Sequence, residues 1–224
     1  MPASARPFVL VFLGDSLTQG YGLRREQSLP AQLQALLDQQ GLNIEVRNAG
    51  VSGETSAQGL RRFDAATKDA DGVVIQFGGN DMLQGRSPAA IEADLHELIA
   101  RARARKLWVG LVGMKAPPIA GAAYRQAFDR IFQDLAEEHE APLYRFYFEG
   151  LIDEHASAAR QEFFLDRVHP NAKGVAVIAE RVGTGWSGRC RRALSDREAS
   201  APISSSSHFA QPRSRVAVCL HEGP

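Results

Sequence analysis

Cysteine is nearly absent from this chain of 224 residues, which contains only Cys190 and Cys219. Both lie close to the C-terminal end, so the long segment before Cys190 has no thiol at all. That segment therefore cannot hold a disulfide framework, a thiolate zinc site or a cysteine nucleophile. Any catalytic group in it has to be a hydroxyl, an imidazole, an amine or a carboxylate.

An excess of charge is also missing, because 26 Lys and Arg residues balance 26 Asp and Glu residues. A chain without net charge has no overall field that would attract nucleic acid or an anionic membrane. We therefore expect a small diffusible molecule as the partner and no nucleic acid. The composition does not define an oligomeric state.

Long hydrophobic runs are missing from the start of the chain. The longest run there, residues 8–13, is too short to span a bilayer and lacks the charged start and small-residue cleavage site of a leader. It runs directly into Gly14, Asp15 and Ser16, and we interpret it as a strand of the fold. We expect no membrane span, and a cytoplasmic location for the chain as written, or a periplasmic or secreted one for a mature form.

Short apolar runs and helical patterns alternate along the chain. The runs are rich in β-branched residues, which is typical of strands buried in a parallel sheet, and they span residues 8–13, 44–46, 73–77, 107–112 and 143–146. Helical patterns, two of them opened by Ser28 and by Ser87 with Pro88, span residues 29–40, 89–105, 124–138 and 171–182. The alternation predicts an α/β fold: a three-layer sandwich with a five-stranded parallel sheet and helices on both faces.

One domain over residues 1–182 accounts for this alternation. Beyond it the pattern stops, because Gly183 and Gly185 interrupt the last helix and four serines later run together. We expect residues 183–224 to form an atypical, disordered C-terminal tail. Its removal should then cost only about 1 kcal/mol of stability.

Three glycine-containing loops follow the first three predicted strands. They carry Gly14-Asp15-Ser16, Gly53, and Gly78-Gly79-Asn80-Asp81. Because ligands of open α/β sheets bind at the carboxyl ends of the strands, we expect these loops to converge on one pocket. Asp15 and Asp81 have no second histidine near them in the sequence, which favours structural hydrogen bonding for both.

A fourth loop supplies a possible base, since Asp166 lies three residues before His169 and ahead of the last helix. A serine hydroxyl needs a base beside it to attack a carbonyl, and a histidine whose tautomer is fixed by a carboxylate serves best. We therefore expect Ser16 to be the nucleophile, His169 the base and Asp166 its orienting partner. The N–H groups of Ser16 and Gly53, together with the Asn80 side chain, would then form the oxyanion hole.

These four blocks, in this order, resemble those of the SGNH or GDSL-type serine hydrolases. Residues 20–22, 78–81 and 112–118 are similar to the bacterial arylesterase and thioesterase I/lysophospholipase branch of that family. The resemblance implies a flavodoxin-like sheet and a carboxylic ester hydrolase that uses no cofactor and no metal. It also implies aryl esters, short- to medium-chain acyl esters and thioesters as substrates, with Asp15, Met114, Pro117 and Pro118 among the substrate-binding residues.

Two alternatives remain at this stage. The first is a carbohydrate acetylesterase of the same family, which a panel of acetylated sugars against phenyl esters would separate. The second is a non-catalytic flavodoxin-like binding module, which would have no use for Asp166 and His169. His96 and Glu97 resemble the start of a zinc-protease helix, but the second histidine of that motif is missing, and we interpret them as part of a solvated helix face.

Overall fold

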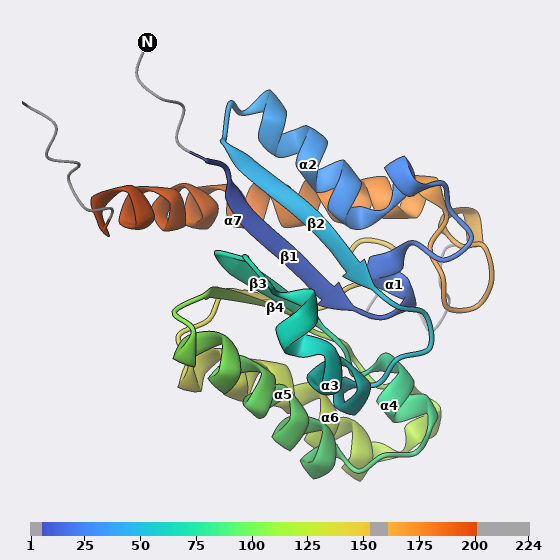
Figure 1. Cartoon of the computed structure of the whole chain (residues 1–224). Coiled ribbons are helices and arrows are strands. Elements are labelled where there is room, and N and C mark those ends of the chain that lie inside the picture. Colours follow the sequence, from blue (N-terminus) through green and yellow to red (C-terminus); the bar gives the residue numbers. More distant parts are fainter. Residues whose placement is uncertain (1–5, 153–160, 201–224) are drawn as a thin grey trace, which may run out of the picture.

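The sheet has five strands, all parallel, in the order β2-β1-β3-β4-β5. The computed structural model describes residues 6–152 and 161–200 (Figure 1). The strands are β1 (Phe8–Gly14), β2 (Ile44–Gly50), β3 (Gly72–Gln76), β4 (Trp108–Val112) and β5 (Leu143–Tyr144). All five overlap the predicted strands, so the predicted parallel α/β sheet is confirmed.

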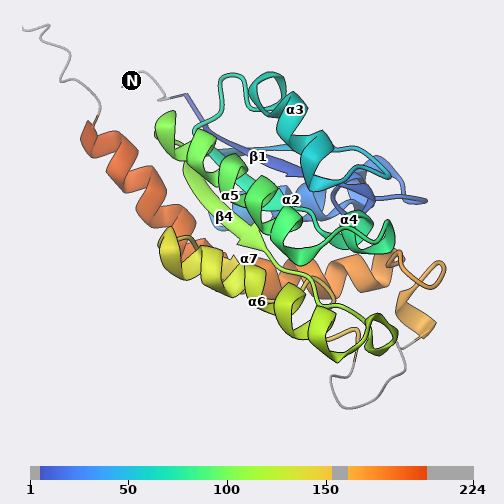
Figure 2. The same ribbon diagram turned by 90° about the horizontal axis from the view of Figure 1, so that it is seen from below.

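Helices cover both faces of this sheet, as predicted. The α-helices are α1 (Ser16–Gln19), α2 (Leu29–Gln39), α3 (Ser56–Ala66), α4 (Gly79–Leu83), α5 (Pro88–Ala104), α6 (Ala122–Glu138) and α7 (Ala172–Ser200), and the 3-10 helices are η1 (Arg25–Gln27), η2 (Pro118–Ala120) and η3 (Gln161–Phe163). One face carries α2 and α7, and the other carries α3, α5 and α6 (Figures 1 and 2). No helix in the described ranges is long and apolar enough to cross a membrane.

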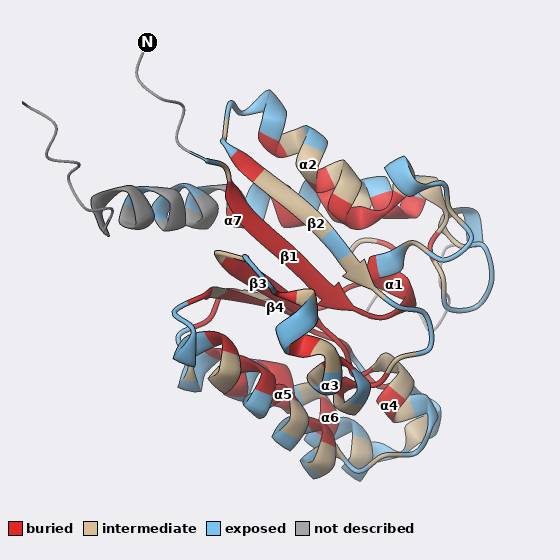
Figure 3. Ribbon diagram, in the orientation of Figure 1, coloured by how far each residue is buried: buried red, intermediate tan, exposed pale blue. Residues whose placement is uncertain are grey.

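Strand β1 lies at the centre of the core. All seven of its residues are buried, because it has a strand on each side and helices on each face (Figure 3). The edge strand β2 is only partly buried. Continuous apolar sequence in β1 and a mixed sequence in β2 are what these two positions require.

Two features of the helices differ from the sequence expectations. Helix α3 is absent from the predicted elements, although a capping box of Thr55 and Gln58 marks its start, with the Thr55 N–H donating to the Gln58 side chain at 2.8 Å. Ser28 does precede α2, but its hydroxyl donates to the Arg25 carbonyl at 2.9 Å instead of capping the helix. Ser87 caps α5 as expected.

The last helix is longer than its sequence predicts. We expected it to end at Val182, and this is wrong, because α7 continues through both glycines to Ser200. A glycine inside a helix costs about 1 kcal/mol relative to alanine. Packing offsets this cost: Gly183 is buried against α2, and a Cβ there would lie 3.2 Å from the Cδ1 atom of Leu36. The rest of the predicted tail, residues 201–224, lies outside the described residues.

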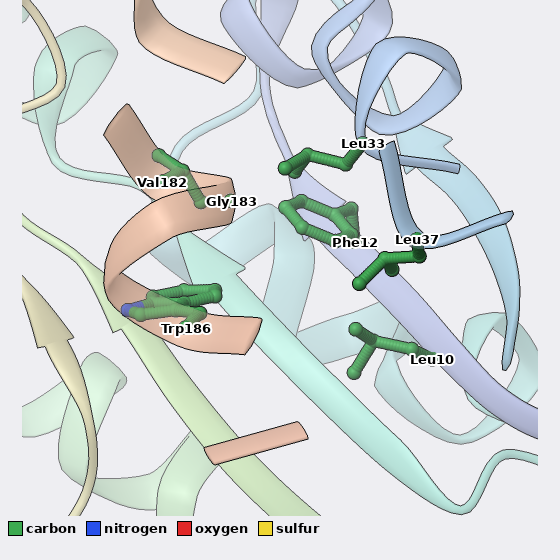
Figure 4. A pocket seen from close by; sticks show the side chains of 7 residues that line it. All are labelled: Leu10, Phe12, Leu33, Leu37, Val182, Gly183 and Trp186. Carbon is green, nitrogen blue, oxygen red and sulfur yellow. The ribbon is translucent and has the colours of Figure 1, made fainter. Parts of the chain in front are cut away.

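Trp186 explains why the helix continues. Its side chain is buried, and its ring meets that of Trp108 in β4 edge to face, with the ring centroids 6.0 Å apart. Together with Val182 and Gly183 it closes a small apolar cavity between α7, α2 and β1 (Figure 4), whose other lining residues are Leu10, Phe12, Leu33 and Leu37. The first turns beyond Val182 are therefore part of the core.

We expect Trp186→Ala to destabilise the protein by about 3 kcal/mol, because it removes a large buried ring from the core. The melting temperature should fall by roughly 6–12 °C, and a chain ending at Val182 should lose at least as much. Thermal unfolding followed by circular dichroism measures this. Thr184→Ala, an exposed change on the same helix, is the control; equal stability of the two variants would contradict the packing role of Trp186.

Candidate active site

The four predicted blocks meet at the carboxyl ends of the strands. Ser16 begins α1 directly after β1, Gly53 lies in the loop between β2 and α3, and Asn80 is in α4, directly after β3. His169 reaches the same place from the loop before α7, with its Nε2 atom 3.0 Å from the Ser16 Oγ atom. The structure thus brings together two residues that are 153 positions apart in the chain.

A continuous row of hydrogen bonds links Asp166, His169 and Ser16. The Nδ1 atom of His169 lies 2.8 Å from Asp166 Oδ2. The other carboxylate oxygen of Asp166 accepts the backbone N–H groups of Val168 and His169, each at 2.7 Å. These bonds, that of the imidazole first, lower the pKa of Asp166 to about 2. The carboxylate is therefore charged and fixed in position next to the imidazole.

Two tyrosines that were not among the predicted site residues border the serine. The ring of Tyr21 lies against the His169 ring, with centroids 4.4 Å apart, and Tyr21 is half exposed. Tyr147 is fully buried, and its hydroxyl donates to the Leu17 carbonyl at 3.0 Å. Both line the pocket beside Ser16 and His169. The position of Tyr21 between two glycines, so close after Ser16, was the available signal; nothing in the sequence around Tyr147 pointed to it.

The three predicted oxyanion donors lie on the segments that follow β1, β2 and β3. The backbone N–H groups of Ser16 and Gly53 have no hydrogen-bond acceptor among the residues that the structure describes. The Asn80 Nδ2 atom donates to the Glu54 carbonyl at 2.9 Å and lies 3.3 Å from Asp15 Oδ2. Because the second contact is long for an N–H···O bond, one of the two Asn80 hydrogens is only weakly engaged.

Arg62 forms hydrogen bonds with both the loop that carries Gly53 and the end of β1. Its Nε atom donates to the Glu54 carboxylate at 2.6 Å, and its Nη2 atom donates to the Gly14 carbonyl at 3.1 Å. The loop that carries Gly53 is thereby anchored to the end of β1, next to Ser16. A guanidinium suits this task, because its planar donors can reach both acceptors at once.

Asp81 is held inside a buried network, as the sequence suggested. Its side chain is fully buried and accepts the hydroxyl of Ser56 at 2.6 Å and a hydrogen bond from Arg86 at 2.5 Å. Arg86 also pairs with Asp94 in α5 at 2.7 Å. The network therefore joins α4, which carries Asn80, to the start of α3 and to the second turn of α5.

The structure does not place Asp15 where it could touch a substrate. Asp15 is only 2% exposed; one carboxylate oxygen accepts the Leu17 N–H at 2.9 Å, and the other faces Asn80. These are structural hydrogen bonds, as the sequence favoured for Asp15, and its burial argues against the direct substrate contact that the family resemblance implied. Burial raises the pKa of Asp15 to about 6, opposed by the hydrogen bond from Leu17.

The other three predicted substrate-binding residues, Met114, Pro117 and Pro118, differ in their positions. Met114 is buried directly after β4, and its Cε atom lies 3.5 Å from the place where a Cβ atom of Gly79 would stand, next to Asn80. Pro117 and Pro118 are exposed at the start of η2, and neither is among the residues that line the pocket beside Ser16. Of the three, only Met114 is brought close to the other predicted residues.

Comparison with known proteins shows the family. Residues 12–177 match the model of the GDSL-like lipase/acylhydrolase family. The chain belongs to this family. It is 35% identical over 175 residues to the esterase TesA of Pseudomonas aeruginosa, a match that covers 73% of this chain and 87% of that protein. It is 33% identical over 173 residues to the thioesterase 1/protease 1/lysophospholipase L1 of Escherichia coli, with 76% of this chain and 79% of that protein covered.

A solved structure supports the same assignment. AlinE4, an SGNH-hydrolase family esterase, is 36% identical with a TM-score of 0.67, over 86% of this chain and 99% of that chain. The GDSL acylhydrolase is thus a carboxylic ester hydrolase, and the non-catalytic binding module considered above is excluded. The predicted family, fold and enzyme class are confirmed.

The shifted pKa of Asp15 makes stability depend on pH in a defined direction. An acid whose pKa is raised by folding stabilises the protein most below its unfolded value of about 4, and this contribution is lost as the pH rises through about 6. Asn cannot titrate. We therefore expect the free energy of unfolding of wild type to fall relative to that of Asp15→Asn, on the order of 3 kcal/mol between pH 4 and pH 7.

Urea unfolding of both proteins at several pH values measures this difference. Groups that titrate equally in the two proteins cancel in the subtraction. Ser195→Ala, a change at an exposed side chain that does not titrate, serves as the control and should give a flat difference. Parallel profiles for wild type and Asp15→Asn would mean that the buried carboxyl does not titrate in this range.

Proposed function

We propose that this GDSL acylhydrolase cleaves esters by two-step acyl transfer, with Ser16 as nucleophile, His169 as base and Asp166 as the residue that orients the base. One observation carries the proposal: the unbroken row of contacts from Asp166 to His169 at 2.8 Å and from His169 to Ser16 at 3.0 Å. A serine, a histidine and a carboxylate at these distances meet the geometric requirement for an activated hydroxyl.

In the first step the Ser16 oxygen attacks the ester carbonyl and its proton passes to His169 Nε2. The C–O bond to the leaving group then breaks, and His169 returns the proton to the departing oxygen. This leaves an acyl group on Ser16. In the second step His169 takes a proton from water, the hydroxide attacks the acyl carbon, and Ser16 is released with its proton restored. Asp166 stabilises the imidazolium in both steps.

The negative oxygen of each tetrahedral intermediate needs preorganised donors. We assign this role to the N–H groups of Ser16 and Gly53 and to the Asn80 side chain. The two backbone groups suit it because no acceptor among the described residues engages them. Asn80 suits it because its bond to Glu54 fixes the amide plane, while its second hydrogen makes only a 3.3 Å contact.

For substrates we propose aryl esters, short- to medium-chain acyl esters and thioesters. The relatives named above are an esterase and a thioesterase 1/protease 1/lysophospholipase L1. The half-exposed ring of Tyr21 beside His169 gives an apolar surface for an aromatic or acyl group next to the serine. A carbohydrate acetylesterase would cleave acetylated sugars instead, and a panel of acetylated sugars against phenyl esters separates the two.

Ser16→Ala should lower kcat at least about 10⁴-fold with the fold intact, because only the attacking oxygen is removed. The assay is phenyl acetate hydrolysis, with circular dichroism as the folding check.

Covalent labelling gives a second test of the nucleophile. A fluorophosphonate should label wild type at Ser16 and leave Ser16→Ala unlabelled, as shown by peptide mapping. Ser195→Ala, an exposed serine on α7, is the matched control. Label on another serine, or more than a tenth of the activity left in Ser16→Ala, would refute the assignment.

Asn80→Ala should lower kcat by about 10²- to 10³-fold, because one oxyanion donor is lost. KM should change little, since the donor acts on charge that develops only in the transition state. Steady-state kinetics with phenyl acetate separates the two constants. A rise in KM at unchanged kcat would show instead that Asn80 binds the substrate ground state.

A further inference from the structure

Three potential metal ligands gather between α5 and α6. His96 lies on α5, Glu138 is the last residue of α6, and His139 caps that helix. Their ligand atoms all lie within 4.8 Å of one another, and no other such group of His, Cys, Asp and Glu occurs in the described part of the chain. His96 Nε2 is 3.3 Å from Glu138 Oε1, and His139 Nε2 is 4.0 Å from the same oxygen.

His139 is the fixed member of this cluster. Its side chain is only 16% exposed, and its buried Nε2 atom has no hydrogen-bond partner among the described residues. Buried polar atoms in folded proteins almost always have a partner, so an isolated one calls for an explanation. Burial also lowers the pKa of His139, against the opposing effect of Glu138. A neutral imidazole with a free nitrogen is what a metal ion binds.

The donor set selects the class of ion. Two imidazoles and a carboxylate suit Zn²⁺ and related transition metals, whereas Mg²⁺ and Ca²⁺ prefer oxygen ligands only. Ligands about 2.0–2.1 Å from a tetrahedral Zn²⁺ lie about 3.3 Å apart. The contact of His96 with Glu138 already has this length. The remaining approach has to come from His96 and Glu138, whose side chains are 46% and 58% exposed, because His139 is largely buried.

We propose that His96, Glu138 and His139 form a Zn²⁺ site that joins α5 to α6. The two helices lie side by side (Figure 2). The centroids of the His96 and His139 rings are 4.9 Å apart. The end of α6 precedes β5 and so lies where the strands begin, whereas Ser16 lies where they end. The ion would therefore act as a structural clamp on the helical layer and take no part in ester cleavage.

The sequence concealed this site because its second histidine comes from another helix. A zinc-protease helix needs both histidines on one helix face, and His96 has no such partner on α5. Glu97, the residue next to it, turns away and pairs with Arg101 at 2.8 Å. The Arg103 guanidinium donates to the His139 carbonyl at 2.8 Å.

Zinc titration of the full-length chain by isothermal calorimetry tests the proposal. The protein is first stripped with a chelator, and its two cysteines are alkylated so that thiolates cannot supply ligands. We expect one Zn²⁺ per wild-type chain. Binding should weaken at least about tenfold in His96→Ala, His139→Ala and Glu138→Gln, and remain unchanged in the matched control Glu97→Gln.

Thermal unfolding gives an independent readout, since an ion that binds only the folded state raises the melting temperature. Zn²⁺ should raise it for wild type and for Glu97→Gln but not for His96→Ala. His96 is half exposed, so this variant keeps the test valid even if His139→Ala fails to fold. Two outcomes would overturn the proposal: no binding by wild type, or equal binding by wild type and His96→Ala, which would place the ion on others of the six histidines.

Discussion

The register of β1 between β2 and β3 is the constraint on which the rest of the site depends. Gly14 pairs with Gly50 on one side and with Gln76 on the other, so three strands end at one level. Strands β1 and β3 lie so close together there that a Cβ on Gly14 would be 2.8 Å from the Gln76 carbonyl oxygen. A shift of β1 by one residue would turn its side chains to the opposite faces and carry Ser16 away from the loops of Gly53 and Asn80.

Much of this arrangement could be predicted from the sequence, because it rests on local patterns. Continuous apolar runs define parallel strands, and the carboxyl-end rule then places the loops after β1, β2 and β3 together. The pairing of Asp166 with His169 is local as well, since three residues separate them. The contact between His169 and Ser16 is different: spacing gives no reason for it, and it was expected because a serine nucleophile needs a base and because four motifs resemble a known family in their order.

The remaining features depend on tertiary contacts that no local pattern contains. Gly183 and Gly185 predicted the end of a helix, yet α7 continues to Ser200, and Trp186 within it packs against Trp108. The family resemblance implied substrate contact for Asp15, yet this residue caps the start of α1 and is buried. In both places the burial of a side chain outweighs the preference of the backbone or of the polar group, which is how packing overrides propensity.

Asp15 and Asp166 show how one small site shifts two carboxyl groups in opposite directions. Asp166 lies at the rim with its side chain 47% exposed, and three hydrogen bonds lower its pKa. Asp15, next to Ser16 in the chain, is only 2% exposed, and burial raises its pKa to about 6. Charge is easiest to maintain where water still reaches it. In the proposed reaction the carboxylate facing the imidazolium has to stay ionised, and the fold places that residue, rather than the buried one, at the rim.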